Sequence, residues 1–179
     1  MDPLHIISKY YKPGSKDYNI LMTHCRVVAD KALKIAQNHK ELMADLDFIH
    51  EAASMHDIGI FKTNSPRLYC YGEFPYICHG YLGSELLTQE GFPDHALVCE
   101  RHIGVGITAE EIIANNLPLP LRDYVPITVE EQIICFADTF YSKSGNLTKE
   151  KTIDEVRKSI KRFGNDHLVR FDEWCQIFN

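Results

Sequence analysis

The clearest pattern in the sequence is a run of apolar residues at helical spacing between residues 17 and 38. Apolar positions recur there every three or four residues, while charged side chains occupy the opposite face. This periodicity predicts an amphipathic helix that packs one face against a core. His24 lies on the apolar face of that helix. A histidine in this position needs a partner inside the protein.

Shorter helical patterns follow along the rest of the chain. Further helices are predicted at about 46–57, 80–89, 93–102, 128–141 and 151–163, with a last helix that reaches about residue 178. Gly59 and Gly91 are expected to end two of them, because glycine commonly follows the last helical turn. Thr108 and Thr128 each precede a glutamate by three residues, which is the spacing of a capping box.

No stretch of more than a few residues alternates between apolar and polar side chains as a strand would. The segment 61–78 is predicted to be a loop, and the prolines between 118 and 126 mark a long connection. The loop is rich in aromatic residues, which we interpret as anchors to the core, with stacking on a nucleobase as the alternative. These aromatic residues are Tyr69, Tyr71, Phe74 and Tyr76. The pattern therefore predicts an all-α fold in a single domain, 1–179.

Composition and charge narrow the class of protein. The formal net charge of −6 argues against general nucleic-acid binding, which needs clustered Lys and Arg. A small anionic substrate remains compatible with this charge, because a metal site can dominate the local field. No apolar run approaches a membrane span, and the N-terminus lacks the pattern of a signal peptide. The six scattered cysteines are interpreted as reduced thiols, and a cytoplasmic location with no membrane association is expected.

The residues that carry chemistry are polar groups in apolar surroundings. Asp138 lies among apolar residues of a predicted helix, as His24 does in the first one. A buried carboxylate is normally paired or bound to metal. The dipeptide His56-Asp57 ends another predicted helix. Imidazole and carboxylate ligands together favour Fe, Mn, Zn or Ni over Ca or Mg.

These motifs resemble the HD-domain superfamily. His24, then His56-Asp57-Ile58-Gly59, then Asp138 are similar to its H…HD…D signature in the HDIG form. His79-Gly80 and Arg101-His102 resemble the additional histidine motifs of the two-metal branch. The stretch 117–126 is similar to a subfamily of predicted hydrolases with an HDIG domain. The resemblance covers about residues 20–145 and leaves predicted C-terminal helices at 148–178 outside it.

The resemblance implies a helical bundle with two divalent transition-metal ions (Fe, Mn, Ni or Zn). By position, His24, His56, Asp57 and Asp138 resemble the ligands of the first ion, and His79 and His102 those of the second. Asp57 resembles the residue that bridges both ions. The implied activity is that of a phosphohydrolase, in which a metal-bridging hydroxide cleaves a phosphate ester or anhydride of a small substrate such as a nucleotide.

A cation is also expected to balance charge that develops on the phosphoryl group. Lys62, three residues after Gly59, is predicted to supply it and so to act with Asp57 in catalysis. Arg101 and Arg122 are weaker candidates, the second at a possible pocket mouth. Thr139 stands where many relatives have a lysine, which removes one possible phosphate contact.

Two other functions are compatible with the same residues. A related histidine and aspartate arrangement supports di-iron oxygenases that cleave a C–C or C–P bond with O₂. A degenerate domain that senses a ligand is a third alternative, against which the intact set of six residues argues.

Overall fold

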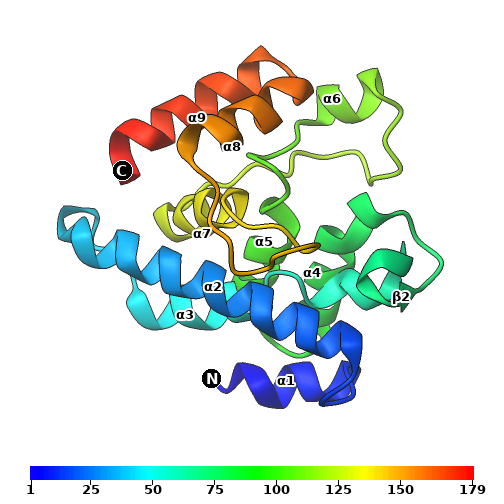
Figure 1. The fold of residues 1–179 in the computed structure, drawn as a ribbon. Coiled ribbons are helices and arrows are strands. Elements are labelled where there is room, and N and C mark those ends of the chain that lie inside the picture. Colours follow the sequence, from blue (N-terminus) through cyan, green and yellow to red (C-terminus); the bar gives the residue numbers. More distant parts are fainter.

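The computed structural model describes all 179 residues, and almost all of its regular structure is helical (Figure 1). Its α-helices are α1 (Pro3–Tyr10), α2 (Lys16–Asn38), α3 (Leu46–Met55), α4 (His79–Gln89), α5 (Pro93–Arg101), α6 (Ala109–Ala114), α7 (Val129–Thr139), α8 (Ile153–Ile160) and α9 (Asn165–Phe178). Short 3-10 helices are η1 (Lys40–Leu42), η2 (Ile58–Lys62), η3 (Pro66–Leu68), η4 (Tyr76–Cys78) and η5 (Lys161–Phe163). The predicted all-α fold is confirmed.

Two strands lie inside the segment predicted to be a loop. β1 (Asn64–Ser65) and β2 (Cys70–Tyr71) pair in antiparallel register, Asn64 with Tyr71 and Ser65 with Cys70. Each strand has two residues, so neither is long enough to show the alternation by which a strand is predicted. The hairpin folds residues 61–78, which we call the hairpin segment, back beside η2.

Helix α1 was not predicted either. Asp2 caps it by accepting a hydrogen bond from the Leu4 amide, and Pro3 occupies its first turn. Ile6 and Ile7 form the buried face of this helix. Eight residues are too few for a clear helical periodicity, so its packing against α3 decides its place.

The helices pack in pairs around a central helix (Figure 1). α2 lies along α3 and α4 lies along α5, while α7 contacts α2, α3 and α5. The larger apolar core joins α2, α3, α5 and α7 to α8 and α9, which lie beyond α7. Phe136 of α7 packs there against Phe140, Phe171 and Trp174 in edge-on and tilted arrangements. None of the helices is long and apolar enough to cross a membrane.

The two predicted capping boxes have different outcomes. The first is complete, because Thr108 and Glu111 bond to each other's backbone amides at the start of α6. The second is only half formed: Thr128 accepts a hydrogen bond from the Glu131 amide, but the Glu131 carboxylate accepts from Arg101 and from the Ile127 amide instead. The ion pair with Arg101 ties α7 to α5.

Gly59 has a different role from the predicted helix end. α3 already ends at Met55, and Gly59 lies in η2 with a negative φ. A Cβ atom at Gly59 would lie 2.2 Å from the His79 carbonyl oxygen and 2.4 Å from the Gly83 amide nitrogen. The missing side chain therefore lets η2 touch the backbone of α4. This contact places the start of α4 beside His56 and Asp57.

Gly59→Ala is expected to lower the free energy of unfolding by at least about 3 kcal/mol, because the added methyl group meets backbone that has no free rotamer to yield. Urea unfolding followed by circular dichroism measures the change. Gly14→Ala is the matched control, since Gly14 has φ of 82° but nothing within 4 Å, and its cost should stay near the 1–2 kcal/mol of left-handed backbone strain. Equal losses in the two variants would contradict the steric role of Gly59.

Candidate metal centre

The six predicted site residues come from separate parts of the chain and meet in the interior. His24 lies in the middle of α2 and Asp138 near the end of α7. His79 begins α4. His56-Asp57 directly follows α3, and His102 directly follows α5. The structure therefore brings the ends of α3 and α5, the start of α4 and the faces of α2 and α7 to one point.

The first group of ligand atoms joins α2, α7 and the end of α3. His24 Nε2 lies 2.8 Å from Asp138 Oδ1 and 3.2 Å from Asp57 Oδ2. His56 Nε2 lies 3.3 Å from Asp57 Oδ2 and 3.6 Å from Asp138 Oδ1. Donor atoms that share an ion at bond lengths of about 2.1 Å are separated by distances of this order.

The second group uses the other oxygen of the same aspartate. Asp57 Oδ1 lies 3.3 Å from His79 Nε2 and 3.2 Å from His102 Nε2. The two histidine nitrogens are 3.1 Å apart. Asp57 thus contributes one oxygen atom to each group, which is the geometry of a carboxylate that bridges two ions.

Hydrogen bonds fix the orientation of three of the four histidines. Nδ1 of His56, His79 and His102 each lies 2.6–2.7 Å from the backbone carbonyl three residues earlier. A carbonyl only accepts, so each Nδ1 donates a proton to it, and each ring is held with Nε2 directed into the centre. The Nε2 atoms of His79 and His102 face each other and the Oδ1 atom of Asp57. This arrangement is typical of metal-binding histidines.

Several buried polar atoms at the centre lack a hydrogen bond of acceptable geometry. They are both ring nitrogens of His24, Nε2 of His56, both carboxylate oxygens of Asp57 and Oδ1 of Asp138. Unpaired buried polar atoms of this kind are costly, and native proteins rarely contain a cluster of them. Two ions, one in each group, would satisfy all of these atoms except Nδ1 of His24, which lies in neither group. The residues therefore fit a two-metal site, and their assignment as ligands stays a prediction.

The pKa shifts at the centre reflect burial and the positive groups that lie beside its two carboxylates. Burial by itself would raise the pKa of Asp57, but the Lys143 ammonium and His56 hold it well below its ordinary value. The pKa of Asp138 is likewise lowered by Lys143 and His24 against the effect of burial. Burial lowers the pKa of His102 to about 4. Ionised carboxylates and a neutral imidazole are the protonation states that bind metal.

Lys143 is the residue of the site that sequence reasoning missed. It lies in the segment between α7 and α8, and its Nζ is 2.9 Å from Asp57 Oδ2 and 3.7 Å from Asp138 Oδ1. Burial would lower its pKa, but the two carboxylates raise it well above the ordinary value. The Ser142-Lys143-Ser144 stretch has no periodicity, so only the three-dimensional path of the chain places it here.

The arginine and lysine candidates lie elsewhere. Arg101 Nη1 donates to both carboxylate oxygens of Glu131, and Arg122 pairs with Glu100, so both arginines have structural partners. Lys62 forms no ion pair or hydrogen bond with the six residues. Its role as the phosphate ligand stays a prediction, while the cation that the structure places against the carboxylates is Lys143.

The cysteines are free thiols, five of them buried, and two support the backbone of the site. Cys99 Sγ donates to the carbonyls of Met55 and His56, at 3.2 and 3.0 Å. Cys135 Sγ donates to the His102 carbonyl at 3.2 Å. Burial raises the pKa of both thiols, so both stay protonated and able to donate.

A cavity of about 560 Å³ opens beside the centre. It is bordered by the hairpin segment, η4 and the stretch after α7. None of the six site residues lines it, and it reaches the centre through Tyr76 and Lys143, which contact His79 and Asp57. Tyr76 stacks on the His79 ring with centroids 4.5 Å apart. The other three aromatic residues interpreted as anchors are exposed, so that interpretation is wrong for them. Leu68 and Cys70 are among the buried residues of the segment.

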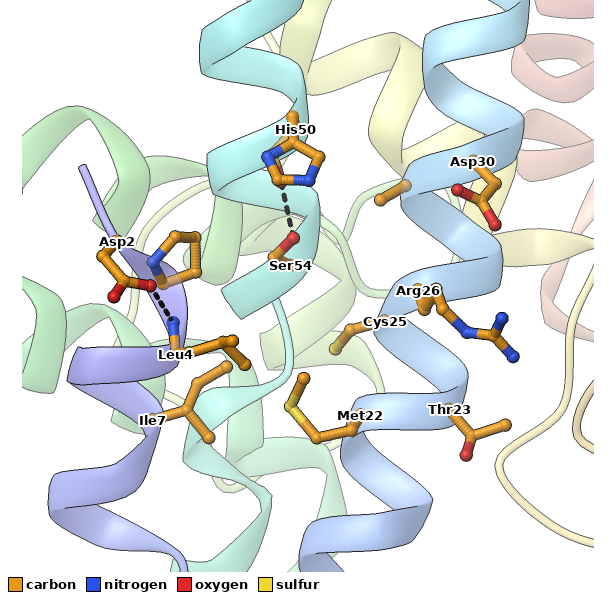
Figure 2. Close-up of a pocket in the computed structure, with 12 residues that line it drawn as sticks. Asp2, Leu4, Ile7, Met22, Thr23, Cys25, Arg26, Asp30, His50 and Ser54 are labelled. Carbon is orange, nitrogen blue, oxygen red and sulfur yellow. Dashed lines mark hydrogen bonds between the residues drawn. The ribbon is translucent and has the colours of Figure 1, made fainter. Parts of the chain in front are cut away.

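A second cavity of about 390 Å³ lies between α1, α2 and α3 (Figure 2). Ile7, Met22 and Cys25 face this space, while His50 and Ser54 come from α3. None of the six site residues lines it. It lies on another side of α2 and α3 and is separate from the metal centre.

Comparisons with known proteins agree with the residue pattern. The HD-domain family model matches residues 21–142, which include all six site residues. An uncharacterized protein of Methanocaldococcus jannaschii is 38% identical over 151 residues, covering 82% of this chain and 79% of its own length. No solved structure matches the chain.

Two further relatives are named tRNA (cytidine(56)-2'-O)-methyltransferase. The protein from Thermoplasma volcanium is 35% identical over 149 residues, and the one from Picrophilus torridus is 32% identical over 151. The matches cover 83% and 84% of this chain but only 39% and 38% of the methyltransferases. The chain is thus similar to well under half of each of these longer proteins.

Proposed function

The chain belongs to the HD-domain family, and from this premise we propose that it is a phosphohydrolase with two divalent transition-metal ions, which cleaves a phosphate ester or anhydride, most simply of a nucleotide. The main support for the proposal is the position of the two Asp57 oxygen atoms. Oδ2 lies beside His24 in the first group of ligand atoms, and Oδ1 lies beside His79 and His102 in the second. Two adjacent ions are the arrangement on which metal-assisted phosphoryl transfer commonly depends.

When bound, such ions would polarise the phosphoryl oxygens and make a water molecule nucleophilic. The protein contributes orientation. The carbonyls of Ala53, Tyr76 and Cys99 hold three imidazoles in place, so no ring needs to turn when the site is filled. Tyr76 covers one face of His79 and restricts water on that side.

The cavity beside the centre supports an anionic substrate. Arg67 and Lys143 line it, and no aspartate or glutamate does, although the chain as a whole has a net charge of −6. Its volume of about 560 Å³ lies within the range of small-molecule sites.

Methyl transfer is not part of the proposal. The match covers 39% and 38% of the relatives with that name, so more than half of each lies outside the shared region. Within the shared region, the inward-facing histidines and carboxylates have the chemistry of a metal site. We propose that this region is an enzymatic unit with its own reaction.

The test is a screen of metal-loaded protein against nucleotides and other phosphate compounds. Protein purified without oxygen and loaded with Mn²⁺ is expected to contain two ions per chain and to release phosphate or a nucleotide product without O₂. Elemental analysis and phosphate release measure the two quantities, and chelated protein is the control. Two irons in a mixed-valent state with O₂ uptake and no hydrolysis would instead establish the oxygenase. Tight metal binding without turnover would indicate a sensor.

A further inference from the structure

Lys143 and the cavity that it lines carry the inference, which rests on the proposed phosphohydrolase activity. The side chain of Lys143 is 15% exposed, which is unusual for a lysine, and its ammonium contacts Asp57 Oδ2 and approaches Asp138 Oδ1. These oxygens belong to the first group of ligand atoms, together with the Nε2 atoms of His24 and His56. Lys143 therefore competes for the carboxylates with any cation bound there.

The charge of the centre explains why a lysine lies beside it. Asp57 and Asp138 are two carboxylates within one buried cluster, and burial of unpaired charge is strongly unfavourable. Arg101, Arg122 and Lys31 pair with Glu131, Glu100 and Glu150 instead. Lys143 is the single Lys or Arg that pairs with the two carboxylates, so it acts as their counter-ion.

Bound metal ions would change the net charge of the centre from negative to positive. Two divalent cations carry four positive charges against two carboxylates, so the carboxylates no longer need the lysine. The ammonium is then a surplus positive charge beside a cationic centre, and it needs an anion. Its side chain already borders the cavity, and it sits on an irregular segment between helices, so it can face a ligand there without a change of fold.

The other lining residues indicate which anion the cavity takes. Most of its polar side chains carry hydroxyls, and Arg67 adds a second cation to the lining. The hydroxyl-bearing residues are Ser65, Tyr76, Tyr141, Ser142 and Ser144. Hydroxyls both donate and accept hydrogen bonds, which suits a polyhydroxylated group such as ribose, and cations suit phosphate.

We propose that Lys143 is the counter-ion of Asp57 and Asp138 before metal binds and becomes a phosphate-binding catalytic residue afterwards. The cavity between the hairpin segment, η4 and the stretch after α7 then holds the rest of the substrate, a phosphorylated compound with a sugar or similar hydroxyl-rich group. Lys143 then has the role of phosphate-binding cation that the sequence predicted for Lys62.

The test compares Lys143→Met with the charge-conserving Lys143→Arg. Lys149→Met is the control, because Lys149 is an exposed lysine of the same segment that forms no ion pair. Calorimetry measures binding of inorganic phosphate to each Mn²⁺-loaded protein. Lys143→Met is expected to weaken phosphate binding about tenfold to a hundredfold, the size of one charge-assisted hydrogen bond, and Lys149→Met to leave it within about twofold. Unchanged phosphate affinity in Lys143→Met overturns the phosphate-binding role.

Metal binding gives a readout that does not depend on turnover. Without its counter-ion, Lys143→Met should melt at a lower temperature than the metal-free wild type and should bind the first Mn²⁺ more tightly. Weaker Mn²⁺ binding would overturn the counter-ion role. Lys143→Arg should resemble the wild type in both measurements, and a loss equal to that of Lys143→Met would show that packing rather than charge is responsible.

The same measurements separate this inference from the proposed function. If the loaded wild type hydrolyses no phosphate compound but binds phosphate in a Lys143-dependent manner, the phosphohydrolase fails and the binding role stands. If it hydrolyses a nucleotide and Lys143→Met keeps both phosphate affinity and rate, the binding role fails and the activity stands.

Discussion

Asp57→Asn is expected to remove most of the bound metal and to lower hydrolysis at least about a thousandfold, the rate equivalent of several kcal/mol of lost metal catalysis. The reason is that both oxygens of Asp57 face ligand nitrogens, Oδ2 in the first group and Oδ1 in the second. An asparagine keeps the shape but loses the negative charge, and its amide nitrogen would face one group with N–H donors where an ion needs a lone pair. One substitution therefore damages both groups at once.

Elemental analysis of the purified variant measures the metal, and phosphate release measures the rate. Asp47→Asn is the matched control, because Asp47 is an exposed aspartate in the first turn of α3, on the same helix that leads to Asp57. The melting temperature of metal-free protein checks that the fold persists. A variant that keeps two ions and its full rate would refute the bridging assignment of Asp57.

The central part of this site could be predicted because its residues carry signals in the sequence itself. His24 and Asp138 interrupt apolar helix faces, and His56-Asp57 ends a helix, so each is recognisable without knowledge of the others. Their order along the chain then identifies a known pattern. The structure brings the six together because helices α2, α3, α5 and α7 pack around one core.

The remaining parts depend on contacts between distant segments, which periodicity does not encode. Lys143 reaches the carboxylates from an irregular segment, and its neighbours in sequence give no sign of burial. Gly59 was taken for a helix end because glycine often has that role, whereas its function is the close approach to α4. Glu131 had the spacing of a capping box, but a long-range arginine pairs with it instead. In each case tertiary packing overrides a local rule.

His79→Ala tests whether the two groups of ligand atoms hold separate ions, and it is expected to leave one ion per chain. The first group would keep His24, His56, Asp138 and one oxygen of Asp57, whereas the second would keep only His102 and the other oxygen. Two protein ligands are too few to hold a transition metal tightly, since catalytic sites commonly supply three. Hydrolysis should fall at least about a hundredfold, because one ion cannot clamp both the attacking and the leaving oxygen.

Metal titration by calorimetry and elemental analysis would count the ions, with His5→Ala as the control at an exposed histidine of α1. Retention of one tightly bound ion at near wild-type affinity would show that Asp57 binds it with one oxygen independently of the other. Loss of both ions would show instead that the second ion is needed to hold Asp57 in place. A full complement of two ions would remove His79 from the ligand set, and Tyr76, which stacks on its ring, would then be the group to examine for how the centre is closed.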